Sequence, residues 1–143
     1  MQRAFRYLFA LLVSFIGGFA PANEPSSSGN ISIELNAADP HENGCTLTFL
    51  ITNGFAQAMD RVIYETVLFD RSGQVDRLTL FDFGALPSER PRVRQFAVPD
   101  LTCDELGRVL FNGASTCEGD GLPPSACDAG FTPSSRIEVE VIG

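Results

Sequence analysis

The chain has 143 residues, of which 44% are hydrophobic, and it carries 18 acidic residues against 10 basic ones, all of them arginine. An acidic protein of this kind repels phosphate backbones and anionic lipid headgroups, which argues against nucleic acid or a charged membrane surface as its partner. The length is that of one domain of common size with a short leader.

The first 22 residues have the order of parts of a cleavable signal peptide. Arg3 and Arg6 form a positive start, residues 7–20 are almost wholly apolar, and Ala20-Pro21-Ala22 offers small residues for cleavage. An uncleaved anchor is the alternative, but the apolar run is shorter than the roughly 20 residues of a membrane-spanning helix. We therefore expect export to the periplasm or beyond, with no stable membrane insertion after cleavage.

Residues 23–30 contain no core-forming side chain and are predicted to be a flexible leader. Residues 31–143 are then expected to form a single β-sandwich domain. Once Arg3 and Arg6 are removed with the signal peptide, the chain holds 8 basic and 18 acidic residues, a net charge of about −10.

Alternating apolar and polar residues predict two strands at the start of this domain, at 31–36 and 45–52. A turn is predicted between them at 39–44, and Asn53-Gly54 is predicted to end the second strand. The alternation places Cys45 on the core side of its strand, as a buried disulfide requires.

Five further strands are predicted, at 61–70, 75–83, 93–98, 106–111 and 137–141. The first of them is apolar on both faces, which is typical of a central strand and leaves its inward face open. A change of phase between Val93 and Phe96 predicts a bulge there. Asn112-Gly113 is predicted to end the strand that precedes it.

The seven short strands, with Gly and Pro between them and no helical period, indicate an all-β fold. The order of elements fits an immunoglobulin-like β-sandwich of about seven strands with two disulfides. The chain contains no Trp, so it lacks the Trp that packs on the disulfide in many immunoglobulin domains.

The chain has four cysteines, an even number that indicates two disulfides in an exported protein: Cys45, Cys103, Cys117 and Cys127. No Cys-x-x-Cys motif occurs, which argues against a zinc site and against thioredoxin-like chemistry. Three pairings are possible. We favour Cys117–Cys127, because these two bracket one turn-rich loop, and Cys45–Cys103 then remains.

Residues 46–99 resemble the FxLYD type of bacterial sandwich domain. The segments that carry the resemblance are Leu47-Thr48-Phe49-Leu50-Ile51-Thr52-Asn53-Gly54, Thr66-Val67-Leu68-Phe69-Asp70-Arg71-Ser72-Gly73, Leu86-Pro87 and Phe96-Ala97-Val98-Pro99. Phe69 stands where this type usually has Tyr. The shared motifs mark strand ends and turns, so the resemblance implies a fold and no activity.

The whole exported chain also resembles an uncharacterised family of small secreted proteins from alphaproteobacteria. That resemblance rests on Glu65-Thr66-Val67-Leu68-Phe69-Asp70, Leu80-Phe81-Asp82-Phe83-Gly84, Arg90-Pro91-Arg92-Val93-Arg94-Gln95-Phe96 and Cys117-Glu118-Gly119-Asp120-Gly121. It implies a periplasmic location and no particular activity.

The most suggestive candidate for a partner-binding site is a group of three arginines, Arg90, Arg92 and Arg94. In a strand, Arg92 and Arg94 point to the same side. Two interpretations are open. The arginines pair with carboxylates of the same chain, or they form a docking patch whose guanidinium groups bind an acidic partner.

Other candidate sites have simpler explanations. His41, the single histidine, lies in a predicted turn, where a solvated residue is the expected role and a general base the alternative. The acidic residues Glu118, Asp120 and Asp128 lie in or beside the Cys117–Cys127 loop and offer oxygen ligands of the kind that Ca²⁺ prefers. Asp70, Asp76 and Asp82 are a second carboxylate set whose separations the sequence does not give.

These observations predict a non-enzymatic exported protein, a protein-binding or accessory structural module, with no catalytic residues, no metal and no cofactor. Its expected partner is an unidentified periplasmic protein. The alternatives are a small secreted hydrolase or inhibitor-like effector that acts through His41 or the acidic loop, and a calcium-stabilised domain.

Overall fold

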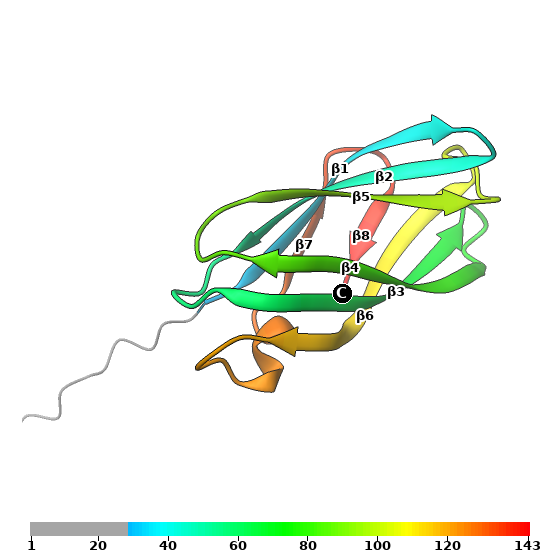
Figure 1. Cartoon of the computed structure of the whole chain (residues 1–143). Coiled ribbons are helices and arrows are strands. Elements are labelled where there is room, and N and C mark those ends of the chain that lie inside the picture. The colour runs from blue at the N-terminus through cyan, green and yellow to red at the C-terminus, as the bar shows by residue number, and fades with distance from the viewer. Residues whose placement is uncertain (1–28) are drawn as a thin grey trace, which may run out of the picture.

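Eight strands fold into two four-stranded sheets that pack face to face in the computed structural model, which describes residues 29–143 (Figure 1). The predicted signal peptide and all but the last residues of the predicted leader lie outside the described residues. The all-β sandwich expected from the sequence is confirmed. The elements are β1 Ile31–His41, β2 Gly44–Asn53, β3 Met59–Asp70, β4 Val75–Leu86, β5 Arg92–Pro99, β6 Leu106–Glu118, the short 3₁₀ helix η1 Pro124–Cys127, β7 Thr132–Ser135 and β8 Glu140–Ile142.

One sheet has the strand order β5-β2-β1-β7 and the other β4-β3-β6-β8. Strands 1, 2 and 5 thus lie in one sheet and strands 3, 4 and 6 in the other, which is the immunoglobulin-like order. The chain ends in two short strands that run parallel to their neighbours: β7 pairs with β1, and β8 pairs with β6. Within residues 29–143, no helix is long and apolar enough to cross a membrane.

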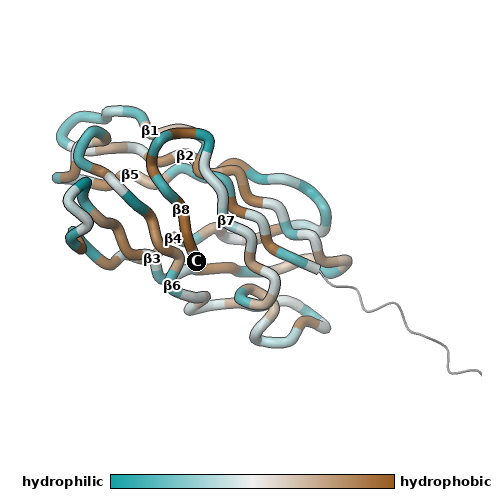
Figure 2. Tube along the Cα trace, turned by 180° about the vertical axis from the view of Figure 1, so that it is seen from behind, coloured by the Kyte–Doolittle hydropathy of each residue, from teal (hydrophilic) through white to brown (hydrophobic). Residues whose placement is uncertain are grey.

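Strict alternation along the first two strands builds one wall of the core. Ile31, Ile33 and Leu35 in β1 are fully buried, and so are the inward residues of β2 from Cys45 to Ile51. Hydrophobic residues gather along the strands, whereas the connecting loops are mostly hydrophilic or neutral (Figure 2). The predicted inward faces of both strands are confirmed.

The central position predicted for the strand at 61–70 is also confirmed, because β3 lies between β4 and β6. Its inward face, which the sequence left open, carries Val62, Tyr64 and Leu68. Val67 lies on the opposite, outer face and is still only 7% exposed. The side chains of its neighbours across the sheet therefore cover it.

Aromatic side chains fill the centre of the sandwich in place of the missing Trp. Phe49 from β2 lies 5.7 to 6.1 Å, centroid to centroid, from four other rings, those of Phe81, Phe83, Phe96 and Phe111. All four pairs are tilted or edge-to-face, which are favourable arrangements for aromatic rings. Because the rings come from both sheets, this cluster holds the two layers together.

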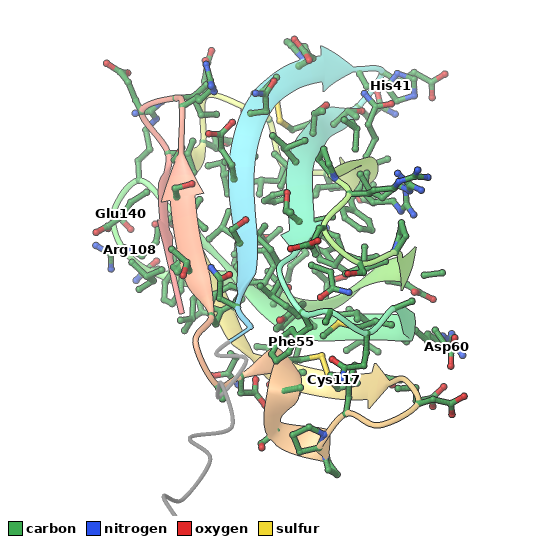
Figure 3. The ribbon with its side chains drawn as sticks, turned by 90° about the vertical axis from the view of Figure 1, so that its left-hand side faces the viewer. His41, Phe55, Asp60, Arg108, Cys117 and Glu140 are labelled. Atoms are coloured by element: carbon green, nitrogen blue, oxygen red, sulfur yellow. A yellow bond between two sulfur atoms is a disulfide. The ribbon has the colours of Figure 1, made fainter. Side chains whose placement is uncertain are left out.

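Both predicted disulfides are confirmed, Cys45–Cys103 and Cys117–Cys127. The first joins the start of β2 to the loop between β5 and β6, and the second joins β6 to η1. Cys45 lies opposite Pro40 at the hairpin end of β1 and β2. Figure 3 shows His41, at this hairpin, and Cys117 in different parts of the molecule.

Asn53 explains how the chain leaves β2, since it is a fully buried polar residue. Its side-chain amide donates to the carbonyl oxygens of Gln57 at 2.8 Å and Leu86 at 3.1 Å, and its Oδ1 accepts from the N–H of Phe55 at 2.9 Å. The side chain is thus fully used, and it ties the β2–β3 loop to the end of β4.

Two predicted strand ends, at the turn 39–44 and at Asn112-Gly113, are wrong for the same reason. Hydrogen bonding to the neighbouring strand decides how far each strand continues. The hairpin at 39–44 is shorter than predicted, because β1 stays paired as far as His41 and only two residues remain in the turn. Asn112-Gly113 does not end its strand. β6 continues to Glu118, because register shifts at Asn112 and Ser115 absorb the irregular backbone as bulges.

The predicted bulge between Val93 and Phe96 is also wrong, because β5 pairs with β2 in one unbroken register. Val93 simply points outward and is 57% exposed. At the C-terminus, the predicted strand 137–141 is reduced to β8 at Glu140–Ile142. β7, with the sequence Thr-Pro-Ser-Ser, has no local strand signal and was not predicted.

Candidate functional site

The three predicted arginines do not form one open cluster. Arg92 and Arg94 share one side of β5, as predicted, and this is the side that carries Phe96 and the buried Val98. Arg94 reaches across to the edge of the other sheet, where its Nε donates to the carbonyl oxygen of Phe83 at 2.8 Å. A second nitrogen donates to the carbonyl of Ala85 at 3.3 Å.

Arg94 therefore closes the side of the sandwich between the edge strands β4 and β5. Arg92 bonds only the carbonyl of the preceding Pro91, at 3.0 Å, and Arg90 is exposed. Within residues 29–143 none of the three forms an ion pair with a carboxylate. A docking role for Arg90 and Arg92 stays a prediction.

We expect Arg94→Met to lower the free energy of unfolding by about 1.5–3 kcal/mol, the range for hydrogen bonds made by a charged group. Methionine keeps the apolar stem and removes the donors to β4. The matched control is Arg92→Met in the same strand, for which we expect a change within about 0.5 kcal/mol. Equilibrium urea unfolding measures both, and equal losses would contradict the role given to Arg94.

The predicted residues of a catalytic or metal site are scattered. His41 ends β1 in an exposed hairpin, and Asp82 is bound to Arg61 at 3.0 Å on the outer surface. Asp128, beside the second disulfide, accepts a hydrogen bond at 2.8 Å from the N–H of Ala114. Among the described residues, no three His, Cys, Asp or Glu side chains are placed to hold one metal ion.

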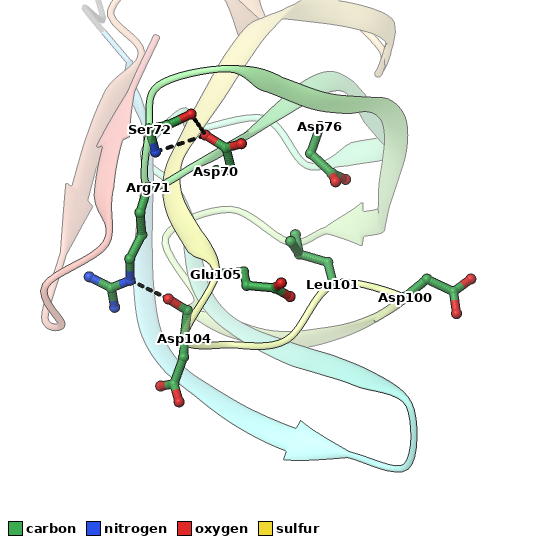
Figure 4. Close-up of a pocket in the computed structure, with 8 residues that line it drawn as sticks. All are labelled: Asp70, Arg71, Ser72, Asp76, Asp100, Leu101, Asp104 and Glu105. Atoms are coloured by element: carbon green, nitrogen blue, oxygen red, sulfur yellow. Dashed lines mark hydrogen bonds between the residues drawn. The ribbon is translucent and has the colours of Figure 1, made fainter.

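An acidic cavity of about 370 Å³ lies at the end of the molecule where β3 meets the β5–β6 loop (Figure 4). It unites two members of the second carboxylate set predicted from the sequence, Asp70 and Asp76, with residues that the sequence did not link to them. These are Arg71, Ser72, Asp100, Leu101, Asp104 and Glu105. No motif joins these segments, so only the fold brings them together.

Most polar groups of this cavity serve the local backbone. Asp70 Oδ1 accepts from the N–H of Ser72, from the Ser72 hydroxyl and from the N–H of Gln74. These bonds, the one from the hydroxyl foremost, hold the pKa of Asp70 below its usual value. Glu105 likewise accepts from the hydroxyl and the N–H of Thr102, and both bonds lower its pKa.

The lowered pKa values predict acid sensitivity. A carboxylate whose pKa is lower in the folded state stabilises the fold above its unfolded pKa, and this contribution disappears as the pH falls through the folded pKa. We expect the free energy of unfolding to decline below about pH 5, since unfolded Asp and Glu titrate near pH 4. In Asp70→Asn this decline should be shallower, as measured by urea unfolding between neutral and acid pH. An unchanged pH slope in the variant would contradict the assignment.

Tyr64 closes the core beneath the second disulfide. Its hydroxyl donates to the carbonyl oxygen of Cys127 at 2.6 Å. Burial raises the pKa of this hydroxyl above its usual value, and the charge of Asp128 adds to the shift. Tyr64 is therefore a neutral structural group over the whole physiological range.

The outer face of the sheet β4-β3-β6-β8 is the most unusual surface of the described chain. Leu78, Val67, Leu110 and Ile142 stand directly opposite one another, so one apolar residue from each strand forms a row across the whole sheet. Leu80 and Val75 extend it along β4. Leu78, Leu80 and Val75 are 61%, 60% and 55% exposed. We call these six residues the apolar row.

The charged residues beside the apolar row are paired with one another. Arg61 and Asp82 lie 3.0 Å apart at one end of the sheet. At the other end of the sheet, Arg108 Nε lies 2.5 Å from Glu140 Oε2. These two side chains lie side by side at the edge of the molecule (Figure 3). Glu65, between them, accepts from the side-chain amide of Asn112 at 2.5 Å. This face thus presents apolar side chains framed by charges that already have partners.

Comparison with known proteins adds little to this picture. No family model matches the chain, and no curated protein matches it. One solved structure, the Salmonella enterica trimeric lipoprotein SadB, is similar to part of it, with 13% sequence identity and a TM-score of 0.43 over 49% of this chain and 40% of that one. The chain thus spans less than half of that structure, and the resemblances noted in the sequence stay predictions.

Proposed function

We propose that this protein is an exported, non-enzymatic module that binds another protein through the apolar row. The observation that carries the proposal is the exposure of three large apolar side chains, Leu78, Leu80 and Val75, beside one another on β4. Single exposed apolar residues are ordinary on protein surfaces, but a continuous apolar patch with a polar rim marks an interaction site.

The partner that fits this surface is a folded protein with a flat apolar patch. The row is formed by strands of a rigid sheet, so it needs no rearrangement to dock. The charges at its rim are paired within the sheet, so they offer no specific site for a highly charged ligand. The same sandwich places His41 in an exposed hairpin and Asp70 in a turn, roles that suit structure and solvation better than catalysis.

Side-chain labelling with a photogenerated carbene tests this function. The purified protein is labelled at low concentration, alone and in the presence of a total extract of the cell envelope. We expect labelling of Leu78 and Leu80 to fall in the extract, because a partner covers the apolar row. Val93 is the matched internal control, since it is similarly exposed, at 57%, but lies on the other sheet. Equal labelling with and without extract at Leu78 and Leu80 would refute the proposal.

Export through a cleaved signal peptide is part of the proposal. Two disulfides are typical of proteins that fold outside the cytoplasm, and the order of residues in 1–22 supports cleavage after Ala22. The intact mass of the protein recovered from the producing cells should therefore correspond to a chain that starts at Asn23 with both disulfides formed. A mass that retains the first 22 residues would contradict cleavage.

A further inference from the structure

We propose that the partner adds one of its own strands to the open edge of β4, so that the sheet β4-β3-β6-β8 and its apolar row continue into the partner. This inference rests on the proposed function and specifies how the partner binds. The added strand pairs with the backbone of residues 77–82, carries apolar side chains on the face of the row, and has an acidic end beside Arg92.

The edge of β4 is open over residues 77–82. Because β4 is the last strand of its sheet, alternate residues point their backbone N–H and C=O groups away from β3. The register with β3 is unbroken from Arg77 to Asp82, and the residues between these two include no charged residue and no Pro. Arg94 binds carbonyl oxygens of β4 only further along, at Phe83 and Ala85. The outward donors and acceptors of this stretch therefore fit another extended strand.

The three other edge strands are protected. Along β5, arginine side chains already donate to three carbonyl oxygens at the strand or just before it, those of Pro91, Val93 and Pro99. β7 has only four residues, one of which is Pro133, and β8 has only three. Short, covered or Pro-containing edges resist the addition of a strand.

Two longer strands have uncovered edge segments as well, because β7 and β8 pair with only part of β1 and β6. The uncovered part of β1, beyond Leu35, begins with a bulge and contains Pro40, which has no N–H. The uncovered part of β6, beyond Leu110, has two bulges, and the N–H of Ala114 already donates to Asp128. Bulges interrupt the row of backbone groups. The stretch of β4 is therefore the most regular open edge among the described residues.

The exposure of Leu78 is what the absence of a neighbouring strand produces. Leu78 and Val67 stand directly opposite each other on the outer face of the sheet. Val67 has a strand on each side and is 7% exposed, whereas Leu78 has a strand on one side only and is 61% exposed. Leu80, two residues further along β4, is 60% exposed in the same position. An added strand with apolar residues at alternate positions would cover both leucines and continue the apolar row.

Unpaired positive charge lies near one end of the open edge. Arg94 bonds the carbonyl of Phe83, just past the open stretch, and Arg92 is two residues from Arg94 on the same side of β5. Four of the eight arginines in residues 29–143 pair with carboxylates. Within that range Arg92 bonds only the carbonyl of Pro91, and Arg90 is exposed. Guanidinium groups bind carboxylates well, so a strand with an acidic end complements this corner of the molecule.

Amide hydrogen exchange of the isotope-labelled exported protein, with both disulfides formed, tests the inference with a synthetic strand as the probe. The probe is a peptide of about eight residues that alternates valine and threonine and begins with two glutamates. A second peptide carries the glutamates at its end. We expect exchange of alternate amides within residues 77–82 to slow at least about twofold at peptide concentrations on the order of 1 mM, because only the outward N–H groups gain a partner.

The matched control peptide has the same side chains and methyl groups on its backbone nitrogens, which removes its donors. It should leave the exchange unchanged. Arg92→Gln should weaken the binding of one of the two glutamate peptides about two- to fivefold, the range for an exposed ion pair. Arg136→Gln is the matched control for that change, since Arg136 pairs with Glu34 on β1, away from the β4 edge, and should leave the binding unchanged.

Unchanged exchange within residues 77–82, or equal slowing by the methylated peptide, would overturn the inference, as would an Arg92→Gln protein that binds both peptides as tightly as the unaltered one. Slowing of the same amides as the protein alone is concentrated would also overturn it, because the strand would then belong to a second copy. Failure of the proposed function is separable. Protection of Leu78 and Leu80 from carbene labelling by the cell-envelope extract, with no effect of the peptides on alternate amides, would keep the binding function and exclude strand addition.

Discussion

Replacing Cys45 and Cys103 together by alanine should lower the free energy of unfolding by about 4 kcal/mol, because the cross-link closes a long loop of the unfolded chain. The two cysteines are 58 residues apart in the sequence, whereas Cys117 and Cys127 are only 10 apart. On the same chain-entropy argument the loss of the second disulfide should cost about 3 kcal/mol. Equilibrium urea unfolding of the two double variants measures both losses.

The unaltered protein under full reduction is the control, and it should lose more stability than either double variant. Peptide mapping without reduction should show only the two pairs Cys45–Cys103 and Cys117–Cys127. A Cys45–Cys103 double variant as stable as the unaltered protein, or a cross-link between Cys45 and Cys117, would contradict this description of the framework.

Phe49→Ala is expected to be the most damaging single core substitution, with a loss of about 3–5 kcal/mol of unfolding free energy. The ring is fully buried and lies about 6 Å from four other rings that come from both sheets. Its removal takes away apolar burial and leaves a cavity that the rigid sheets cannot close. Urea unfolding followed by circular dichroism gives the magnitude.

Phe49→Leu retains part of the volume and should cost clearly less than the alanine change. If the alanine variant does not fold, the leucine variant still tests the claim, since it must lose stability while the fold is kept. A Phe49→Leu protein as stable as the unaltered one would mean that the aromatic cluster does not hold the two sheets together.

The sequence predicted the parts of the fold that depend on local pattern. Alternation from Ile31 to Leu35 and from Cys45 to Ile51 identified two strands and their inward faces, because each has one face in the core and one towards solvent. The break between the predicted strands 61–70 and 75–83 is local in the same way, since the side chain of Asp70 bonds its own backbone two and four residues on.

Features that depend on distant partners were missed. A bulge was predicted between Val93 and Phe96, yet the register of β5 is unbroken. Arg94 takes the inner side of the strand, since carbonyl oxygens of β4 are available there to bind it. β7 has no alternating apolar pattern and exists because it pairs with β1, about a hundred positions earlier in the chain. Such pairings leave no local trace in one sequence.

The candidate site likewise combines features that the sequence shows locally with features that depend on distant strand pairing. Val67, Leu78, Leu110 and Ile142 are ordinary apolar strand residues, and only the register of three strand pairs shows that they form one row. The arginines, by contrast, were conspicuous in the sequence. Arg94, however, is used within the fold, and its hydrogen bonds to carbonyl oxygens of β4 explain why a cluster of charge need not be a binding site.

Cross-linking in the producing cells tests the central claim, that protein covers the apolar row, most directly. A photoreactive amino acid is placed at Leu80 and, as the matched control, at Val93, which is similarly exposed on the other sheet. The account predicts a covalent protein adduct at Leu80 and none at Val93. Adducts at Val93 alone, or none at Leu80, would contradict it.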